Sequence, residues 1–97
     1  MSRRYVRGRN FEYQVKYKLV DQGYFVIRAA ASKPIDLVAI RKGDVMLVEC
    51  KRNKKQVTQR LREELRRLGE ALNVSVAVAY RDITGIIIEK VYSPCSR

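Results

Sequence analysis

Two apolar segments of strand length, joined by a glycine turn, constrain this chain more than any other feature of its sequence. The first segment covers Ile35–Ile40, the turn covers Arg41–Asp44, and the second segment covers Val45–Lys51. Their length, their β-branched content and the intervening glycine predict a β-hairpin. Each segment nevertheless carries a carboxylate, Asp36 or Glu49, where a buried strand normally has an apolar residue. A charge at such a position costs free energy unless it is paired or bound to a metal.

The numbering predicts which residues face each other across this hairpin. If the turn is even and centred between residues 42 and 43, Asp36 faces Glu49, with Cβ atoms roughly 5 Å apart. Because side chains alternate along a strand, Lys51 shares a face with Glu49 while Cys50 points away, as a small buried hydrophobe. Two carboxylates this close repel each other, and a divalent cation such as Mg²⁺ removes that repulsion. The sequence therefore predicts a cation site at Asp36 and Glu49, unless an odd loop or a bulge breaks the register.

The charge balance of the chain indicates a polyanionic partner. Lys and Arg number 21 against 10 Asp and Glu, which gives a net charge of +11. This charge favours DNA or RNA over a membrane surface, and no segment approaches the roughly 20 apolar residues of a membrane span. The absence of His and the presence of only two cysteines argue against a zinc finger and against His-based catalysis. We expect metal-dependent cleavage of nucleic acid.

The length of 97 residues predicts a single domain with a thin core, to which dimerisation would add buried surface. The first residues are polar and Arg-rich and contain no apolar signal-peptide segment, so we expect a cytoplasmic, nucleoid-associated protein. Residues 1–9 resemble a basic arm that lies on a nucleic-acid backbone through Arg4, Arg7 and Arg9; the alternative is a solvated tail. High Arg content without His is compatible with an archaeal or viral host.

Periodicity places the remaining elements. The expected order is a helix over Asn10–Gln22, a strand over Tyr24–Ala30, the hairpin, a second helix, and strands over Val74–Tyr80 and Gly85–Tyr92. The second helix is expected to begin at a capping box over Asn53–Gln56. An apolar stripe follows along it, formed by Val57, Leu61, Leu65, Leu68 and Leu72. This order, α-β-β-β-α-β-β, predicts one α/β domain with a mixed sheet flanked by helices.

Several polar residues near the hairpin have two possible roles each. Glu12 adjoins the apolar stripe of the first helix, where it could pair with Lys16 or supply a third carboxylate to the cation. Arg28 could bind a phosphate and Ser32 could hydrogen-bond one, or they could be an ordinary strand-end Arg and turn Ser. A basic loop continues from Lys51 to where backbone phosphates would lie. The residues expected to contact DNA are therefore Arg4, Arg7, Arg9, Arg28, Ser32, Lys33, Arg52, Lys54 and Lys55.

The first half of the chain resembles the archaeal-type Holliday junction resolvases, which are members of the restriction-endonuclease-like PD-(D/E)XK nuclease superfamily. The succession Glu…Arg…Ser…Asp…Glu-x-Lys is more specific than Glu-x-Lys alone. The residues that carry the resemblance are Arg7, Gly8, Glu12, Gly23, Arg28, Ser32, Asp36–Ala39 and Glu49–Lys51.

The resemblance implies a restriction-endonuclease-like core and a homodimer that cuts two opposed strands of a four-way DNA junction. Asp36 and Glu49 would bind Mg²⁺ or Mn²⁺ with the Cys50 carbonyl, and Glu12 would complete the acidic cluster. Lys51 would orient the attacking water or stabilise developing charge. Arg28 and Ser32 would bind or position the substrate phosphate.

The chain departs from the family pattern in three ways. Ile35 replaces the Pro that precedes the first Asp, Tyr13 replaces an Arg after the helix Glu, and aromatic residues expected near the second helix are absent from a short segment after Lys51. The last two departures bear on junction selectivity and on the dimer interface. Two alternatives remain: another small nuclease of this fold that acts on flaps, ends or duplex DNA, and a non-catalytic DNA-binding protein of the same fold.

Overall fold

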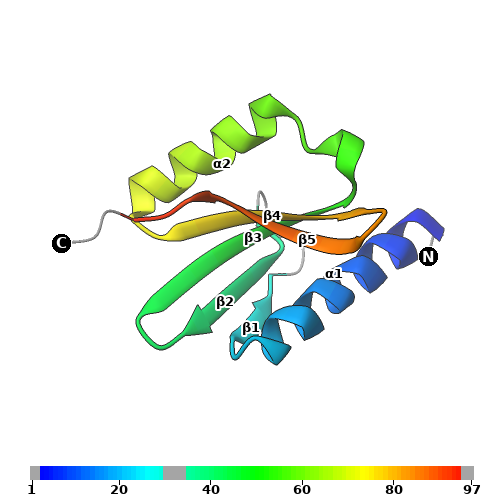
Figure 1. The fold of residues 1–97 in the computed structure, drawn as a ribbon, viewed down its shortest axis with the longest axis horizontal. Helices are drawn as coiled ribbons and strands as arrows, with labels where there is room; N and C mark the ends of the chain where they lie inside the picture. The colour runs from blue at the N-terminus through cyan, green and yellow to red at the C-terminus, as the bar shows by residue number, and fades with distance from the viewer. Residues whose placement is uncertain (1–2, 30–34, 95–97) are drawn as a thin grey trace.

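Five strands form one mixed sheet, with a helix on each of its two faces (Figure 1). The computed structural model describes residues 3–29 and 35–94, with side chains from Asn10 onward. The expected α-β-β-β-α-β-β order is confirmed, with one short 3₁₀ turn added. The elements are α1 (Arg3–Asp21), β1 (Phe25–Arg28), β2 (Leu37–Arg41), β3 (Asp44–Asn53), η1 (Lys54–Gln56), α2 (Gln59–Leu72), β4 (Ser75–Asp82) and β5 (Gly85–Tyr92).

The strands lie in the order in which they occur in the chain, β1-β2-β3-β4-β5. Only β3 and β4 are parallel; the other neighbours are antiparallel and joined by short connections. Parallel neighbours need a crossover connection, and α2 supplies it. The crossover places α2 on the face opposite α1, so each face of the sheet has its own apolar cluster.

Helix α1 buries the stripe that the sequence predicts. Phe11, Val15 and Leu19 are all buried and pack against β1, β2 and β3. The helix ends before Gly23, whose φ of +94° suits a residue without Cβ. The helix begins at Arg3, however, and not at Asn10, so most of the expected arm is helical. Its arginines are good helix formers that the apolar pattern could not register, and their side chains lie outside the described set.

The start of α2 differs from the sequence prediction. The capping box at Asn53 and Gln56 forms as expected, but it caps the separate turn η1. Helix α2 begins only at Gln59, with Thr58 as its own N-cap, so the prediction of one continuous helix is wrong. Two capping residues five positions apart each satisfy a set of free amides, which allows the chain to bend between them.

The two helices cover different parts of the sheet. Helix α1 packs on β1, β2 and β3, whereas α2 packs on β4 and β5. The α2 side of β1, β2 and the start of β3 is left exposed within the described residues, whereas Leu47 further along β3 packs against the α2-side cluster. We call the exposed part the open sheet face. The strand registers place five partly or well exposed apolar side chains together on it: Phe25, Ile27, Val38, Ile40 and Val45.

None of the helices in residues 3–29 and 35–94 is both long and apolar enough to cross a membrane.

Candidate active site

The register of the β2–β3 hairpin is the one that the numbering predicts. Arg41 pairs with Asp44 beside the turn, and the pairing continues to Leu37 opposite Val48. Asp36 is the next residue, where β2 begins. Its amide donates to the Val48 carbonyl at 3.0 Å, and its carbonyl accepts from the Ala29 amide at 2.8 Å. Asp36 is therefore held by backbone hydrogen bonds from both neighbouring strands.

The carboxyl groups of Asp36 and Glu49 lie together beside the start of β2. The Cys50 amide donates to Asp36 Oδ2 at 2.8 Å. Glu49, a residue that is only 9% exposed, forms a side-chain hydrogen bond with Asp36. Two acidic groups can share a hydrogen bond only if one of them holds a proton. The structure thus confirms the convergence of these two residues, which the hairpin register predicts.

The environment of Glu49 favours its neutral form. Burial, followed by the hydrogen bond and the charge of Asp36, raises the pKa of Glu49 to about 8. The positive charge of Lys51 and the Cys50 amide oppose this rise without reversing it. At neutral pH the pair therefore holds a proton that a bound cation would displace.

Glu12 forms an ion pair that its spacing did not indicate, and its role as a third carboxylate for the cation stays a prediction. Its Oε1 accepts from Arg28 Nε at 2.8 Å, so it pairs with a cation from β1 and not with Lys16. Burial raises the pKa of Glu12, the hydrogen bond from Arg28 lowers it, and Asp36 raises it further. Glu12 thus borders the Asp36–Glu49 pair while being tied to Arg28.

Across residues 3–29 and 35–94, no three Asp, Glu, His or Cys side chains are arranged so that they could hold a metal ion. The donor set that the described residues offer is therefore a carboxylate pair. Such a pair suits Mg²⁺, which typically takes one or two carboxylates and keeps several waters. The chemistry of this donor set fits the expected cation, and Glu12 lies beside the pair, in contact with Asp36.

Arg28 contacts both Glu12 and an aromatic ring. Besides its ion pair, its guanidinium carbon lies 5.4 Å from the centroid of the Tyr13 ring. A planar guanidinium can stack on such a ring while it donates hydrogen bonds in its own plane. Tyr13, the residue that departs from the family pattern, thus contacts the arginine of the site.

The segment after Glu49 is irregular. The pairing of β3 with β4 shifts register between Cys50 and Asn53, at Lys51 and Arg52. Bulges of this kind bend a strand and change the direction of its side chains, often beside active sites. The Cys50 side chain packs against the α1-side core, as expected, and burial raises the pKa of its thiol. Cys50 therefore offers a neutral thiol, in keeping with its expected role as a small hydrophobe.

The expected DNA-contacting residues divide into three groups. Arg52, Lys54 and Lys55 are exposed and follow directly from the site. Arg28 is tied to Glu12. The remaining five lie outside the described side chains: Arg4, Arg7, Arg9, Ser32 and Lys33.

Arg81 is a candidate that the sequence analysis missed. Its guanidinium donates to Gln14 and lies 5.6 Å from the centroid of the Phe11 ring. It shares a small groove with Arg52, because β4 pairs Arg81 with Asn53. In the sequence, Arg81 is simply a charge after an apolar strand; only the parallel pairing of β3 and β4 brings it beside the basic loop.

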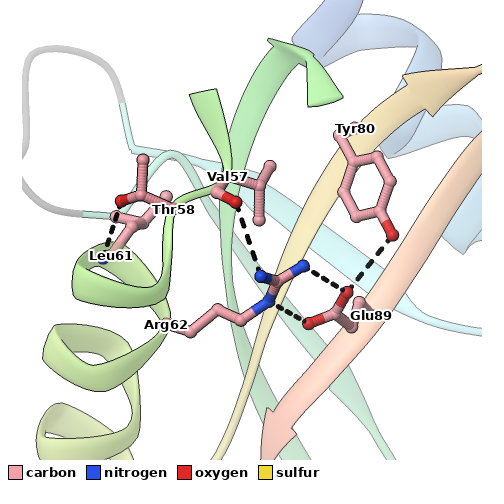
Figure 2. Close-up of polar contacts among 6 residues, drawn as sticks. All are labelled: Val57, Thr58, Leu61, Arg62, Tyr80 and Glu89. Atoms are coloured by element: carbon pink, nitrogen blue, oxygen red, sulfur yellow. Dashed lines mark hydrogen bonds and ion pairs between the residues drawn. The ribbon is translucent and has the colours of Figure 1, made fainter. Parts of the chain in front are cut away.

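The charged residues of α2 form a different kind of surface. Within the helix, arginines and glutamates pair at i,i+3 and i,i+4, as expected for a solvated face. Arg62 instead reaches the sheet, where its Nε and Nη2 donate to Glu89 at 2.7 and 3.1 Å (Figure 2). The Tyr80 hydroxyl donates to the same carboxylate at 3.2 Å. Mainly because of Arg62, the pKa of Glu89 is lowered.

Comparisons with known proteins agree with the motif. A family model described as archaeal Holliday junction resolvase (hjc) matches residues 3–84. Over 68 residues the chain is 40% identical to the crossover junction endodeoxyribonuclease Hjc of Methanocaldococcus jannaschii, an alignment that covers 70% of this chain and 51% of that protein. The chain thus spans about half the length of this curated relative.

A solved structure shows the same fold. The Holliday junction resolvase Hjc from Archaeoglobus fulgidus matches with a TM-score of 0.70 and 21% identity, over 88% of this chain and 73% of that chain. This likeness confirms the expected mixed α/β architecture. Because the family model covers most of the sequence and the curated relative shares 40% of the aligned residues, this chain belongs to the archaeal Holliday junction resolvase family.

Proposed function

We propose that this chain is a metal-dependent endodeoxyribonuclease that resolves four-way DNA junctions. The observation that carries the proposal is the adjacent carboxyl pair of Asp36 and Glu49 beside Lys51, in a member of this family. The net charge of +11 supports a nucleic-acid substrate. A non-catalytic DNA-binding protein would gain nothing from a buried carboxyl with a raised pKa.

Asp36 and Glu49 would hold Mg²⁺ or Mn²⁺, with the Cys50 carbonyl as a further oxygen ligand. Such a cation supplies an activated water at neutral pH and positive charge for the scissile phosphate. The protein contributes the positions of the two ligands: a backbone amide fixes Asp36, and the β3 strand fixes Glu49. Preformed ligands of this kind lose little entropy when the ion binds.

The neighbouring cations have separate roles in this proposal. Lys51 lies close enough to Glu49 to lower its pKa, and its ammonium would stabilise the charge that develops on the phosphate. Arg28 would donate to a non-bridging phosphate oxygen while Glu12 and Tyr13 hold its plane. Glu12 is therefore assigned as a positioning residue for Arg28, in contact with Asp36.

We also propose that two copies of the chain associate through the open sheet face. Paired cuts on opposed strands require two sites, and each chain has one Asp36–Glu49 pair. The open sheet face exposes 68% of Phe25 and 47% of Ile27 side by side. A second copy would cover such a surface by a self-complementary contact. Phe25→Glu should give monomers in sedimentation analysis; a Phe25→Glu dimer as stable as the wild type would contradict this interface.

Cleavage of matched substrates tests the proposed function. A four-way junction, a flapped duplex and a linear duplex of the same sequences are incubated with the protein, with Mg²⁺ or with EDTA. We expect paired nicks in the junction, in Mg²⁺ only. Equal cleavage of all three substrates would favour a nuclease of other specificity. Binding without products on any substrate would favour the non-catalytic alternative.

A further inference from the structure

The β4–β5 turn carries an apolar side chain that the fold does not use. Ile83 stands at the tip of this turn and is fully exposed, with 103% relative accessibility. Single exposed apolar residues are common on protein surfaces and need no explanation by themselves. Two features of its surroundings distinguish Ile83: the hydrogen-bonded turn that presents it and the lysines beside it.

Backbone pairing and side-chain hydrogen bonds hold the turn that presents Ile83. Asp82 pairs with Gly85 across it, and the Asp82 carboxylate accepts from both the amide and the hydroxyl of Thr84, at 2.8 and 2.6 Å. Gly85 has a φ of +123°, which a residue with a Cβ adopts only with strain. A fixed turn holds an exposed side chain in place before any partner binds, which reduces the entropy lost on binding.

Positive charge lies beside Ile83. The turn and η1 together form one shallow groove, lined by Asn53, Lys54, Lys55, Asp82, Ile83 and Thr84. Lys54 is close enough to act electrostatically on Asp82. Both lysines are exposed, and neither ammonium has a side-chain ion pair among those found in the described residues. An apolar tip flanked by cations complements a nucleic acid, which combines apolar base faces with phosphates.

The groove is also close to the proposed catalytic residues. It begins at Asn53, two residues and therefore roughly 7 Å beyond Lys51 along β3. A separation of this size spans only a few nucleotides of a DNA strand, so one bound DNA could contact both the groove and the proposed catalytic residues. In Figure 1 the turn, η1 and the first turns of α1 all lie at the same end of the molecule.

We propose that Ile83 is an apolar wedge that inserts between bases at the branch of the DNA substrate while Lys54 and Lys55 hold the adjacent phosphates. This inference rests on the proposed function and extends it to substrate selection. Bases at a branch are already partly unstacked, so a wedge enters there at a lower cost than in a continuous duplex. Selectivity for branched DNA would then reside partly in a residue outside the catalytic cluster.

The test compares Ile83→Ser with Ile83→Leu, which keeps an apolar tip, and with Leu72→Ser. Leu72 is 55% exposed and precedes β4, whereas Ile83 follows its end, so Leu72→Ser removes exposed apolar surface at the far end of that strand. A four-way junction with 2-aminopurine at the branch reports unstacking by fluorescence in EDTA. Cleavage of the same junction and of a matched duplex in Mg²⁺ gives the selectivity. Thermal unfolding followed by circular dichroism confirms that each variant is folded.

For the wild type, Ile83→Leu and Leu72→Ser, we expect a rise in 2-aminopurine fluorescence on binding. Ile83→Ser should lose most of this rise. Its ratio of junction cleavage to duplex cleavage should fall about tenfold. Unchanged fluorescence and selectivity in Ile83→Ser would overturn the wedge while leaving the nuclease proposal intact. Failure of the wild type to cut any junction would instead overturn the proposed function.

Discussion

Glu49 and Glu89 lie in the same row and on the same face of the sheet, but they have different partners and opposite pKa shifts. Val78 of β4 pairs with Glu49 on one side and with Glu89 on the other, so the three residues form one row on the α2 face. Glu89 receives two hydrogen bonds from Arg62, and its pKa is lowered. Glu49 instead faces Asp36, and its pKa is raised to about 8.

The difference shows how one sheet row can hold both a carboxylate that links a helix to the sheet and one that we propose binds a cation. Arg62 gives Glu89 a fixed counter-charge that links α2 to β5 (Figure 2). Glu49 has a second acid as its nearest partner, with only Lys51 as compensation. Such surroundings destabilise the ionised form of the Glu49 carboxyl until a cation binds.

The largest effect is expected from Glu49→Gln. The amide keeps the shape of the side chain but removes a cation ligand, so junction cleavage should fall by at least about a thousandfold. Binding to a junction should remain within a few-fold of the wild type, because the basic surface is unchanged. Single-turnover cleavage and gel-shift titration measure the two. Cleavage at the wild-type rate would show that Glu49 has been misassigned.

Glu89→Gln should lower the stability of the fold and leave junction cleavage almost unchanged. It removes the charge that Arg62 and Tyr80 share, so the free energy of unfolding should fall by about 1 kcal/mol after allowance for solvent screening. Cleavage of a junction should stay within about twofold of the wild type. Urea unfolding and the same cleavage assay test this. A large loss of cleavage with unchanged stability would place Glu89 in the reaction.

The pH dependence of stability should separate the two residues. Because the folded-state pKa of Glu49 is raised, its stabilising contribution is complete below about 4.5 and is lost as the pH rises to about 8. The pKa of Glu89 is lowered, so its contribution is present above about 4.5 and is lost on acidification.

Urea unfolding in EDTA across this pH range measures both contributions. Between pH 5 and 8 the wild type should lose at most about 1.4 kcal/mol per pH unit from Glu49, and Glu49→Gln should remove this slope. Glu89→Gln should instead reduce the loss of unfolding free energy that accompanies acidification below about pH 4.5. Identical curves for Glu49→Gln and the wild type would contradict the raised pKa.

A smaller effect is expected at Tyr13. Tyr13→Phe keeps a ring beneath Arg28, whereas Tyr13→Ala removes it. Loss of one stacking contact should lower kcat on a junction roughly three- to tenfold in the alanine variant and leave the phenylalanine variant near wild type. Cation affinity should be equal in both. A loss in Tyr13→Phe as large as that in Tyr13→Ala would implicate the hydroxyl and not the ring.

Local patterns in the sequence predicted the order of the elements and the centre of the candidate site. The hairpin register followed from one even turn, and it correctly placed Asp36 next to Glu49. The α1 stripe of Phe11, Val15 and Leu19 followed from its spacing. Each of these depends on residues that are near one another in the chain or on a strict period.

Features that depend on distant segments were not predictable in the same way. The pairing of Glu12 with Arg28 needs α1 and β1 to be packed together. Arg81 reaches the basic loop only through the parallel pairing of β3 with β4, which a sequence pattern does not specify. The separate start of α2 after η1 arose because both Asn53 and Thr58 can cap, and spacing alone does not choose between them.

Calorimetric titration of Mn²⁺ into the protein at pH 7, in buffers of different ionisation enthalpy, tests the central claim most directly. With a pKa of about 8, Glu49 is roughly nine-tenths protonated at this pH, so a cation that binds the pair must displace its proton. The account predicts release of close to one proton per bound ion in the wild type, and weak or no binding in Glu49→Gln. Equal Mn²⁺ affinity in both proteins, without proton release, would contradict it.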